Sequence, residues 1–143
     1  MRYSSVLTFA RAYLTGILLV AVGLLNATTL YVTTGADSGP GSLRQLLQQA
    51  DEEDVIKFSP SLANQTISLL SPLVINSGIT IDGQRLNLTL DGRGATRIFL
   101  IEALEKKIHI SHLTLLGGLA TTSGGAIRLE AGALWLRYVD IEG

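Results

Sequence analysis

The sequence predicts an all-β fold, a parallel β-helix of about four coils preceded by one short helix. Three observations support this fold. After Val55 the apolar residues recur at every second position, which is the period of a strand with one buried face. Short segments repeat at offsets in the twenties, and turn-forming residues separate them. The 143 residues therefore divide into a leader at 1–27, a cap region at 28–54 and coils at 55–143.

Residues 1–27 have the pattern of a secretory leader. Two arginines, an apolar run over residues 12–25 and small residues near Ala27 follow one another in that order. A helix over the apolar run spans about 21 Å, which is short of the roughly 30 Å hydrocarbon core of a membrane. We expect cleavage after Ala27, or after Gly23, and a location outside the cytoplasm. An uncleaved N-terminal membrane anchor is the alternative.

Composition and charge exclude several functional classes. Outside the leader, nine basic residues stand against twelve acidic ones, so the positive excess of a general nucleic-acid binder is lacking. The chain contains no cysteine, which excludes a disulfide framework and thiolate metal sites. An apolar content of 47% with nearly balanced charge is typical of a folded chain and not of a disordered one.

The cap region predicts one strand and one helix. Residues 30–34 have a strand-like composition and precede a turn rich in Gly and Pro. Ser42 and Gln45 have the spacing of a capping box, and the apolar residues that follow share one helical face. These features predict a short amphipathic helix over residues 43–51. Acidic residues at its end oppose the macrodipole, so packing must hold the helix in place.

The coils are predicted as very short strands joined by tight turns. Each strand alternates apolar with mostly polar residues, so one face of each strand is buried. Sequences rich in Gly, Asn, Asp and Ser lie between the strands and are typical of turns. The predicted strands cover residues 67–69, 79–81, 86–90, 108–110, 113–115, 134–136 and 139–141.

An internal repeat predicts that these strands form a solenoid. Three pairs of segments align without gaps, at offsets of 25, 26 and 28 residues: 88–92 with 113–117, 107–117 with 133–143, and 101–103 with 129–131. In the longest pair all four inward apolar positions match. A leucine-rich repeat would need a recurring Asn or Cys and usually a helix in each unit, and the chain has neither. The repeat therefore favours a β-helix.

Two motifs add a family resemblance. Residues 41–46 read Gly-Ser-Leu-Arg-Gln-Leu, close to the Cys-Ser-Leu-Arg-Glu-Ala signature of one branch of large secreted bacterial right-handed parallel β-helix proteins. The run at 32–47 resembles the N-terminal cap of those proteins. Residues 124–127 read Gly-Gly-Ala-Ile and are similar to an element of chlamydial polymorphic outer-membrane proteins. Further similar segments lie at 55–62, 65–67, 73–75, 79–83, 97–99 and 113–118.

The resemblance implies a fold and a location outside the cytoplasm, and it implies no particular reaction. Such proteins are typically long, polymorphic-outer-membrane-protein-like or autotransporter-like, right-handed β-helices that are secreted or sit at the cell surface. The present sequence stops at Gly143 without a C-terminal cap or a translocation domain, so we expect the N-terminal part of a longer solenoid. We also expect the isolated chain to associate edge to edge, because an uncapped solenoid exposes strand edges.

Four charged residues are the candidates for catalysis if the chain is an enzyme. A β-helical lyase or hydrolase needs clustered Asp, Arg or Lys on one exposed face, and Asp82, Asp91, Arg93 and Arg97 are the only plausible set. However, each aspartate precedes a glycine at the end of a strand, where its carboxylate can accept a bond from the following backbone and the glycine is expected to provide positive φ. The turn role is therefore favoured over the catalytic one.

No metal or cofactor site is predicted. His109 and His112 are three residues apart, which in a strand places them on opposite faces, with His109 towards solvent and His112 at a bend. The glycines at 124–125 lack the strand-and-helix context of a nucleotide loop. Trp135 lies on the polar side of its strand, and with Tyr138 it is a candidate for stacking against carbohydrate.

These observations favour a secreted or cell-surface protein with a structural or adhesin-like role and no catalytic site of its own. The expected partners are a surface carbohydrate or a protein on a host or cell surface, without nucleic acid, and with membrane contact only through the leader. Two alternatives stay open. The chain is either the N-terminal part of a β-helical polysaccharide lyase or glycoside hydrolase, or a truncated reading frame without independent function.

Overall fold

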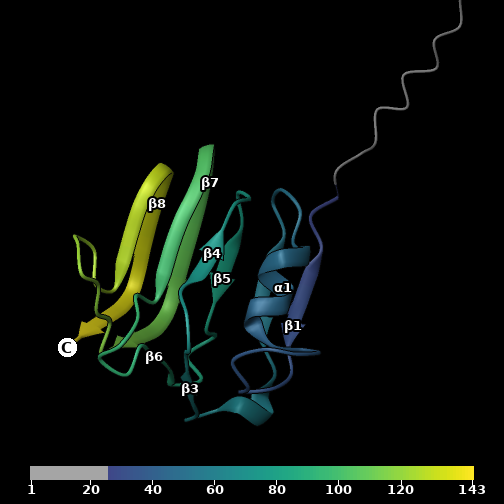
Figure 1. Ribbon diagram of the computed structural model, residues 1–143. Coiled ribbons are helices and arrows are strands. Elements are labelled where there is room, and N and C mark those ends of the chain that lie inside the picture. Colours follow the sequence, from purple (N-terminus) through teal and green to yellow (C-terminus); the bar gives the residue numbers. More distant parts are fainter. Residues whose placement is uncertain (1–25) are drawn as a thin grey trace, which may run out of the picture.

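The structure is a computed structural model that describes residues 26–143. It is a parallel β-solenoid of about four turns, with one short helix near the beginning of the described chain (Figure 1). The predicted all-β fold and parallel β-helix are confirmed, and the right-handed sense stays a prediction. The predicted leader lies almost entirely in residues 1–25, outside the described residues. Within residues 26–143, no helix is long and apolar enough to cross a membrane.

Ten elements make up the described chain, and all strand pairs between them are parallel. Their bounds are β1 Thr29–Val32, α1 Leu43–Gln49, β2 Val55–Phe58, η1 Pro60–Leu62, β3 Thr66–Ser68, β4 Leu73–Ile75, β5 Thr80–Asp82, β6 Leu88–Asp91, β7 Phe99–Leu116 and β8 Ile127–Glu142. β7 and β8 are long because each bends around two corners and contributes to all three faces of the solenoid.

The strands form three faces, which we name A, B and C. Face A contains β1, β2, β5 and the middle parts of β7 and β8. Face B contains β3, β6 and the final parts of β7 and β8, and face C contains β4 and the first parts of β7 and β8. In face A, Val55, Thr80, His109 and Trp135 are successive partners. Each coil therefore returns the chain to the same position of the same face.

The predicted alignments at offsets 25 and 26 are confirmed by the pairing of β6 with β7 and of β7 with β8. The alignment at offset 28 holds for Ile101, which pairs with Leu129, but it is wrong for Glu102 and Ala103. Glu102 pairs with Ala131, and Glu130 is an extra, bulged residue. A second register shift follows, because β7 has four residues, 103–106, at a corner that β8 turns with one.

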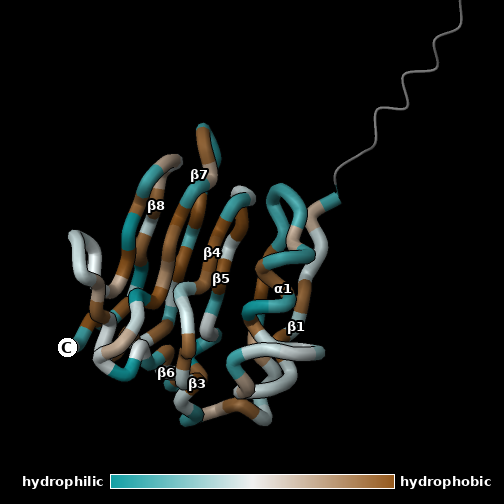
Figure 2. The backbone as a smooth tube through the Cα atoms, in the orientation of Figure 1, coloured by the Kyte–Doolittle hydropathy of each residue, from teal (hydrophilic) through white to brown (hydrophobic). Residues whose placement is uncertain are grey.

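The interior is filled by aliphatic side chains stacked coil upon coil. In face A, Ile56, Ile81 and Ile110 lie at one position of successive coils, and each is at most 1% exposed. In face B, Leu90 lies against Leu115 in the same way. Burying each such side chain contributes about 1.5–3 kcal/mol. Figure 2 shows the resulting alternation of apolar and polar residues along the strands.

The predicted helix is present as α1, and it ends at Gln49 instead of residue 51. The predicted N-cap is confirmed, because the Ser42 hydroxyl accepts a bond from the Gln45 amide (3.2 Å). The Gln45 side chain accepts from the Gly41 amide (2.7 Å), one residue before the N-cap amide of a standard capping box. The helix ends early because the Asp51 amide donates to the carboxylate of Asp54 (2.9 Å). α1 packs against β1 and β4 through its buried leucines.

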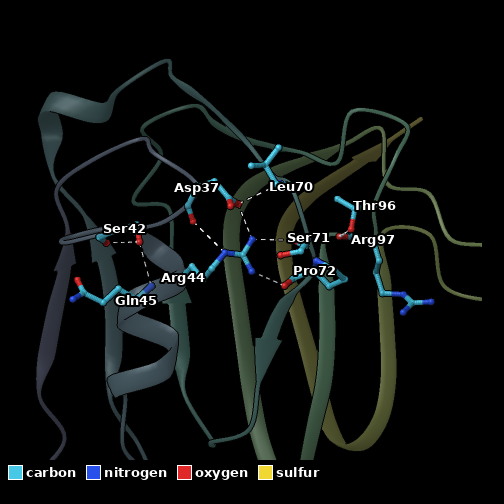
Figure 3. A network of polar contacts seen from close by, with 10 residues as sticks. Asp37, Ser42, Arg44, Gln45, Leu70, Ser71, Pro72, Thr96 and Arg97 are labelled. Atoms are coloured by element: carbon cyan, nitrogen blue, oxygen red, sulfur yellow. Dashed lines mark hydrogen bonds and ion pairs between the residues drawn. The ribbon is translucent and has the colours of Figure 1, made fainter.

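Arg44 forms a clamp between α1 and two other segments (Figure 3). Its guanidinium pairs with the Asp37 carboxylate at 2.6 Å and donates to the carbonyl oxygens of Ser71 (2.8 Å) and Pro72 (2.7 Å). Asp37 also accepts a bond from the Leu70 amide (3.3 Å). The clamp therefore ties the cap helix to the turn before it and to the loop that leads into β4.

Removing the guanidinium tests the clamp. We expect Arg44→Met, which keeps most of the aliphatic stem, to lower the free energy of unfolding by about 1–3 kcal/mol, because two carbonyl oxygens and a carboxylate lose a charged donor. Denaturant unfolding followed by circular dichroism measures the loss. Arg93→Met is the matched control, since within residues 26–143 the Arg93 side chain forms no hydrogen bond or ion pair. Equal losses in the two variants would contradict a specific role for Arg44.

Gly132 allows a steric test of close approach between coils, at the corner where β8 turns from face C to face A. Its φ is +99°, and a Cβ there would lie 2.4 Å from the Ala103 carbonyl oxygen. Gly39 has a similar φ of +95° with nothing within 4 Å. We expect Gly132→Ala to lower the free energy of unfolding by about 2–4 kcal/mol and Gly39→Ala by about 1 kcal/mol. Denaturant titrations compare them, and similar losses would mean that the coils do not approach closely at Gly132.

Candidate functional site

The corner between faces A and B contains a left-handed residue at one equivalent position in each of four coils. Asn64, Asn87, His112 and Tyr138 have φ values of 61°, 54°, 56° and 54°. The register of face B places the four residues at one position of successive coils. Asn and His tolerate this conformation better than most residues other than glycine, whereas Tyr does so rarely. We call these four residues the corner column.

Two of the three neighbouring pairs in the corner column touch through their side chains. The Asn87 side-chain amide nitrogen donates to the side-chain oxygen Oδ1 of Asn64 at 3.1 Å. The rings of His112 and Tyr138 stack with their centroids 5.1 Å apart and their planes 17° from parallel. Parallel strands of successive coils are about 4.8 Å apart, which is close to the spacing of the stacked rings. The strand ladder therefore brings equivalent side chains into direct contact.

A second ring stack lies on the outer side of face A. His109 and Trp135 have centroids 4.9 Å apart and planes 11° from parallel. The predicted outward direction of His109 is confirmed, and Trp135 and Tyr138 are 46% and 61% exposed. An imidazole covers one face of each of these two candidate carbohydrate-contact rings. Their remaining faces and edges are the surface that a ligand can reach.

The prediction that His109 and His112 lie on opposite faces is wrong. The left-handed turn at His112 interrupts the alternation of the strand, so His112 also lies on the outer surface, where its Nδ1 is 2.9 Å from the Asp82 carboxylate. Their rings stack on different partners, Trp135 and Tyr138. Among the described residues no group of three or more His, Cys, Asp or Glu side chains has the geometry of a metal site.

Asp82 collects three hydrogen bonds at the end of β5. Its Oδ1 accepts from the Gln84 amide (2.9 Å), the Ser111 hydroxyl (3.1 Å) and Nδ1 of His112 (2.9 Å). The first bond confirms the predicted turn role of the carboxylate. The positive φ predicted for the glycine after each aspartate is wrong, since Gln84 and Arg93 have left-handed φ values and Gly83 and Gly92 do not. Burial on its own would raise the pKa of Asp82, but these three donors outweigh burial and hold the pKa below its usual value. The carboxylate is therefore ionised at neutral pH, and its Oδ1 is engaged by these three donors.

The Asp82–His112 pair orients an imidazole in the way a carboxylate orients a catalytic base. Since an ionised carboxylate only accepts, Nδ1 carries the proton of this hydrogen bond. Nε2 is buried and has no hydrogen-bond partner among the described residues. The Ser111 hydroxyl bonds to the carboxylate, not to Nε2, so it is not activated as a nucleophile. In this arrangement Nε2 is not exposed at the surface of the hollow.

The other candidate catalytic residues are placed separately. Asp91, at the end of β6 in face B, accepts a bond from the Arg93 amide (2.7 Å), which confirms its predicted turn role. Arg93 is exposed at that turn. Arg97, also labelled in Figure 3, donates to the carbonyl oxygens of Gly124 (2.6 Å) and Ser123 (2.9 Å). The structure does not bring these groups together with Asp82 in one polar network, and a catalytic role for any of them stays a prediction.

A shallow hollow of about 220 Å³ runs along the corner column. Three successive coils supply its lining: Arg85, Asn87, Leu88, His112, Leu113, Thr114, Tyr138 and Asp140. The guanidinium of Arg137 lies over the Tyr138 ring, 5.0 Å from its centroid, and donates a long bond of 3.4 Å to its hydroxyl. This bond, the charge of Arg137 and the charge of Arg85 lower the pKa of Tyr138. The hollow thus combines an aromatic ring with cationic, anionic and neutral polar groups.

The geometry of the corner is the basis for assigning a function. No family model matches the chain, and a search of curated proteins finds no match either. The likeness of the cap region to bacterial surface proteins therefore stays a resemblance. Extending the predicted alignment of residues 88–92 with 113–117 by one position would have placed Asn87 over His112. No sequence signal joins Asp82 to His112, because they belong to different faces and to coils of different length.

The lowered pKa of Asp82 predicts acid sensitivity. An aspartate in the unfolded chain titrates at about pH 3.9, so it binds its proton at a higher pH than Asp82 does in the folded chain. The stabilisation is therefore present above that pH and is lost as the pH falls through it towards the folded pKa. We expect the free energy of unfolding to fall below about pH 4, and Asp82→Asn to remove part of this fall, as measured by urea unfolding at a series of pH values.

A second carboxylate and a control complete this test. The pKa of Asp54 is also lowered, because hydrogen bonds from Thr28 and Asp51 outweigh its burial, so Asp82→Asn removes only part of the pH dependence. Asp140→Asn is the control, since the exposed Asp140 side chain forms no hydrogen bond within the described chain. If Asp140→Asn flattens the profile as much as Asp82→Asn does, the bonds to Asp82 are not the cause.

Proposed function

We propose that this chain is a secreted or cell-surface protein with a structural, adhesin-like role, and that it contacts surface carbohydrate through the corner between faces A and B. The observation that carries the proposal is the exposed Tyr138 ring beside a polar hollow, with the exposed Trp135 ring on the adjoining face. The leader predicted at residues 1–27 and the resemblance of the cap region support the extracellular location.

The chemistry of the hollow suits a sugar. A pyranose has apolar C–H faces that pack on aromatic rings and hydroxyl groups that both donate and accept hydrogen bonds. Tyr138 supplies the ring, Asn87 and Thr114 supply groups that donate and accept, Asp140 supplies an acceptor and Arg85 a donor. A volume of about 220 Å³ is small for a drug-sized ligand and suits one sugar unit at a time.

The solenoid also holds these groups rigidly. Every lining residue except Arg85 lies in a strand or next to one. Within the described residues β6 and β7 have parallel neighbours on both sides, and β8 is held by its ladder with β7. A surface that is already ordered loses little conformational entropy on binding, which favours contact with weakly interacting ligands such as glycans. Repetition of the corner in successive coils makes the surface elongated, as a polysaccharide chain requires.

A β-helical lyase or hydrolase is the second candidate. The Asp82–His112 pair favours it, because a carboxylate-oriented imidazole is a common general base. We rank it below the binding role because Nε2 of His112 is buried and Asp82 is occupied by three donors. Incubation of the chain with polysaccharides, followed by an assay for new reducing ends and unsaturated products, distinguishes turnover from binding.

Glycan binding tests the proposal directly. The full chain is screened against an array of glycans, and the strongest ligand is titrated by calorimetry. We expect Tyr138→Ala to weaken binding about tenfold, because the ring that packs on the sugar is removed, and Trp135→Ala to weaken it less. Tyr31→Ala is the matched control, since Tyr31 is 51% exposed on the outer side of face A, in the coil farthest from the hollow.

Two outcomes would contradict the carbohydrate role. One is the absence of binding to any glycan by the folded chain, which would leave a protein on a host or cell surface as the expected partner. The other is an equal loss of affinity in Tyr138→Ala and Tyr31→Ala, which would show that glycan binding does not depend on the corner between faces A and B.

A further inference from the structure

Asp54 is a buried carboxylate in the short segment between α1 and β2. It is 5% exposed, and Ser42 is the only other buried polar residue that the structure describes. Buried carboxylates are usually paired with a cation, because taking an unpaired charge out of water is costly. Within residues 26–143, however, Asp54 takes part in no ion pair. Among the described residues it therefore lacks the partner that such a group normally has.

The carboxylate of Asp54 is held by three neutral donors. Its Oδ1 accepts from the backbone amide of Thr28 (2.8 Å) and from the Thr28 hydroxyl (2.8 Å), and its Oδ2 accepts from the Asp51 amide (2.9 Å). Burial on its own would raise the pKa of Asp54, but these bonds outweigh burial and hold the pKa below its usual value. The group that lies against Thr28 is therefore an ionised carboxylate at neutral pH.

Thr28 is also the first residue of the described chain that the fold holds. Its carbonyl oxygen accepts from the Val55 amide (2.8 Å), and β1 begins at the next residue. Asn26 and Ala27 are exposed and form no hydrogen bond within residues 26–143. The peptide bond between Ala27 and Thr28 thus separates an unbonded segment from the beginning of the solenoid. It is also the bond at which the sequence predicts removal of the leader.

We infer that removal of the leader after Ala27 turns the Thr28 nitrogen into an α-ammonium group that forms an ion pair with Asp54, so that processing supplies the cation and fixes the start of β1. Hydrolysis by a leader peptidase adds the hydroxyl of water to the Ala27 carbonyl carbon and its hydrogen to the Thr28 nitrogen. That nitrogen then takes up a proton from solvent. The inference rests on the secreted character of the chain under the proposed function and adds a processing site to it.

The ion pair needs no rearrangement of the fold. The Thr28 nitrogen already lies 2.8 Å from Oδ1 of Asp54, which is the distance of a charge-assisted hydrogen bond. Because Asp54 is buried, salt screens this pair less than it screens exposed charges. The backbone carbonyl of Asp54 also accepts from the Thr80 amide (2.9 Å). The pair therefore connects the start of β1 to the coil that contains β5.

The position of the cut decides whether the pair forms. A cut after Gly23, the other predicted site, would place the ammonium group on Leu24, four residues before Thr28. Thr28 would then keep a neutral amide, as it would in an uncleaved membrane anchor. The buried carboxylate therefore favours the cut after Ala27 over both alternatives.

The terminus of the exported protein tests the cut. The full chain is expressed with its own leader in a bacterial cell, and the exported product is analysed by mass spectrometry. We expect the product to begin at Thr28. A product that begins at any other residue, or that keeps the leader, would overturn the inference.

The reactivity of the new amine tests the ion pair. Near pH 7 acetic anhydride modifies α-amines in preference to lysines, because lysines stay protonated. In the exported product we expect the Thr28 amine to react about tenfold more slowly in the folded state than in urea, since Asp54 holds it in the protonated, unreactive form. The exposed Lys107 is the internal control, and its rate should change little. Equal protection of the two amines would contradict the pair.

A matched pair of variants assigns the protection to Asp54. Asp54→Asn should raise the rate in the folded state about tenfold, towards the rate in urea. Asp51→Asn should not, because the exposed Asp51 carboxylate forms no hydrogen bond or ion pair within the described chain. Equal rates in the two variants exclude Asp54 as the partner. If Asp54→Asn does not fold, the comparison of the unaltered chain with and without urea decides the question.

Failure of this inference and failure of the proposed function give different results. A product that begins at Thr28 with an unprotected amine overturns the ion pair and leaves the secreted character intact. A leader that stays on the chain overturns the inference and favours the anchored alternative. The glycan titration tests the contact with carbohydrate separately, since neither Thr28 nor Asp54 lines the hollow.

Discussion

The parallel hydrogen-bond ladder between successive coils is the interaction on which the rest of the structure depends. It fixes each strand at one register against the coil before it, so that Ile56, Ile81 and Ile110 occupy equivalent positions. Because side chains alternate along a strand, this register decides at once which residues are buried and which face solvent. The apolar core and the outer surface are therefore two consequences of one backbone constraint.

The same ladder explains the unusual backbone of the corners. A chain that turns sharply and resumes pairing at once needs a residue of left-handed conformation, and the corner column supplies one in each coil. The stacking of these residues is then unavoidable, since the ladder brings them within about 4.8 Å of one another. The candidate binding surface arises from this geometry, with Asn64 and Asn87 hydrogen-bonded and His112 and Tyr138 stacked.

The fold was predictable from the sequence because the repeat and the alternation are one-dimensional signals. The helix, the strand positions and the alignments at offsets 25 and 26 follow from them. Pairs that join different faces were not predictable: Asp82 with His112, and Arg44 with the loop before β4, depend on coil lengths and on turns that no period describes. The bulge at Glu130 was not predictable for the same reason. The continuity of β7 and β8 was not predictable either, because it depends on short corners that resemble loops in composition.

The Arg44 clamp has a consequence for how order spreads through the molecule. In a linear array each unit is stabilised mainly by its neighbours, so ordering can begin anywhere and grow in either direction. Arg44 connects segments on both sides of the first coil and fixes a finished template there before any later coil is needed. We therefore expect order to spread from that template along the solenoid one coil at a time, which gives its assembly a direction.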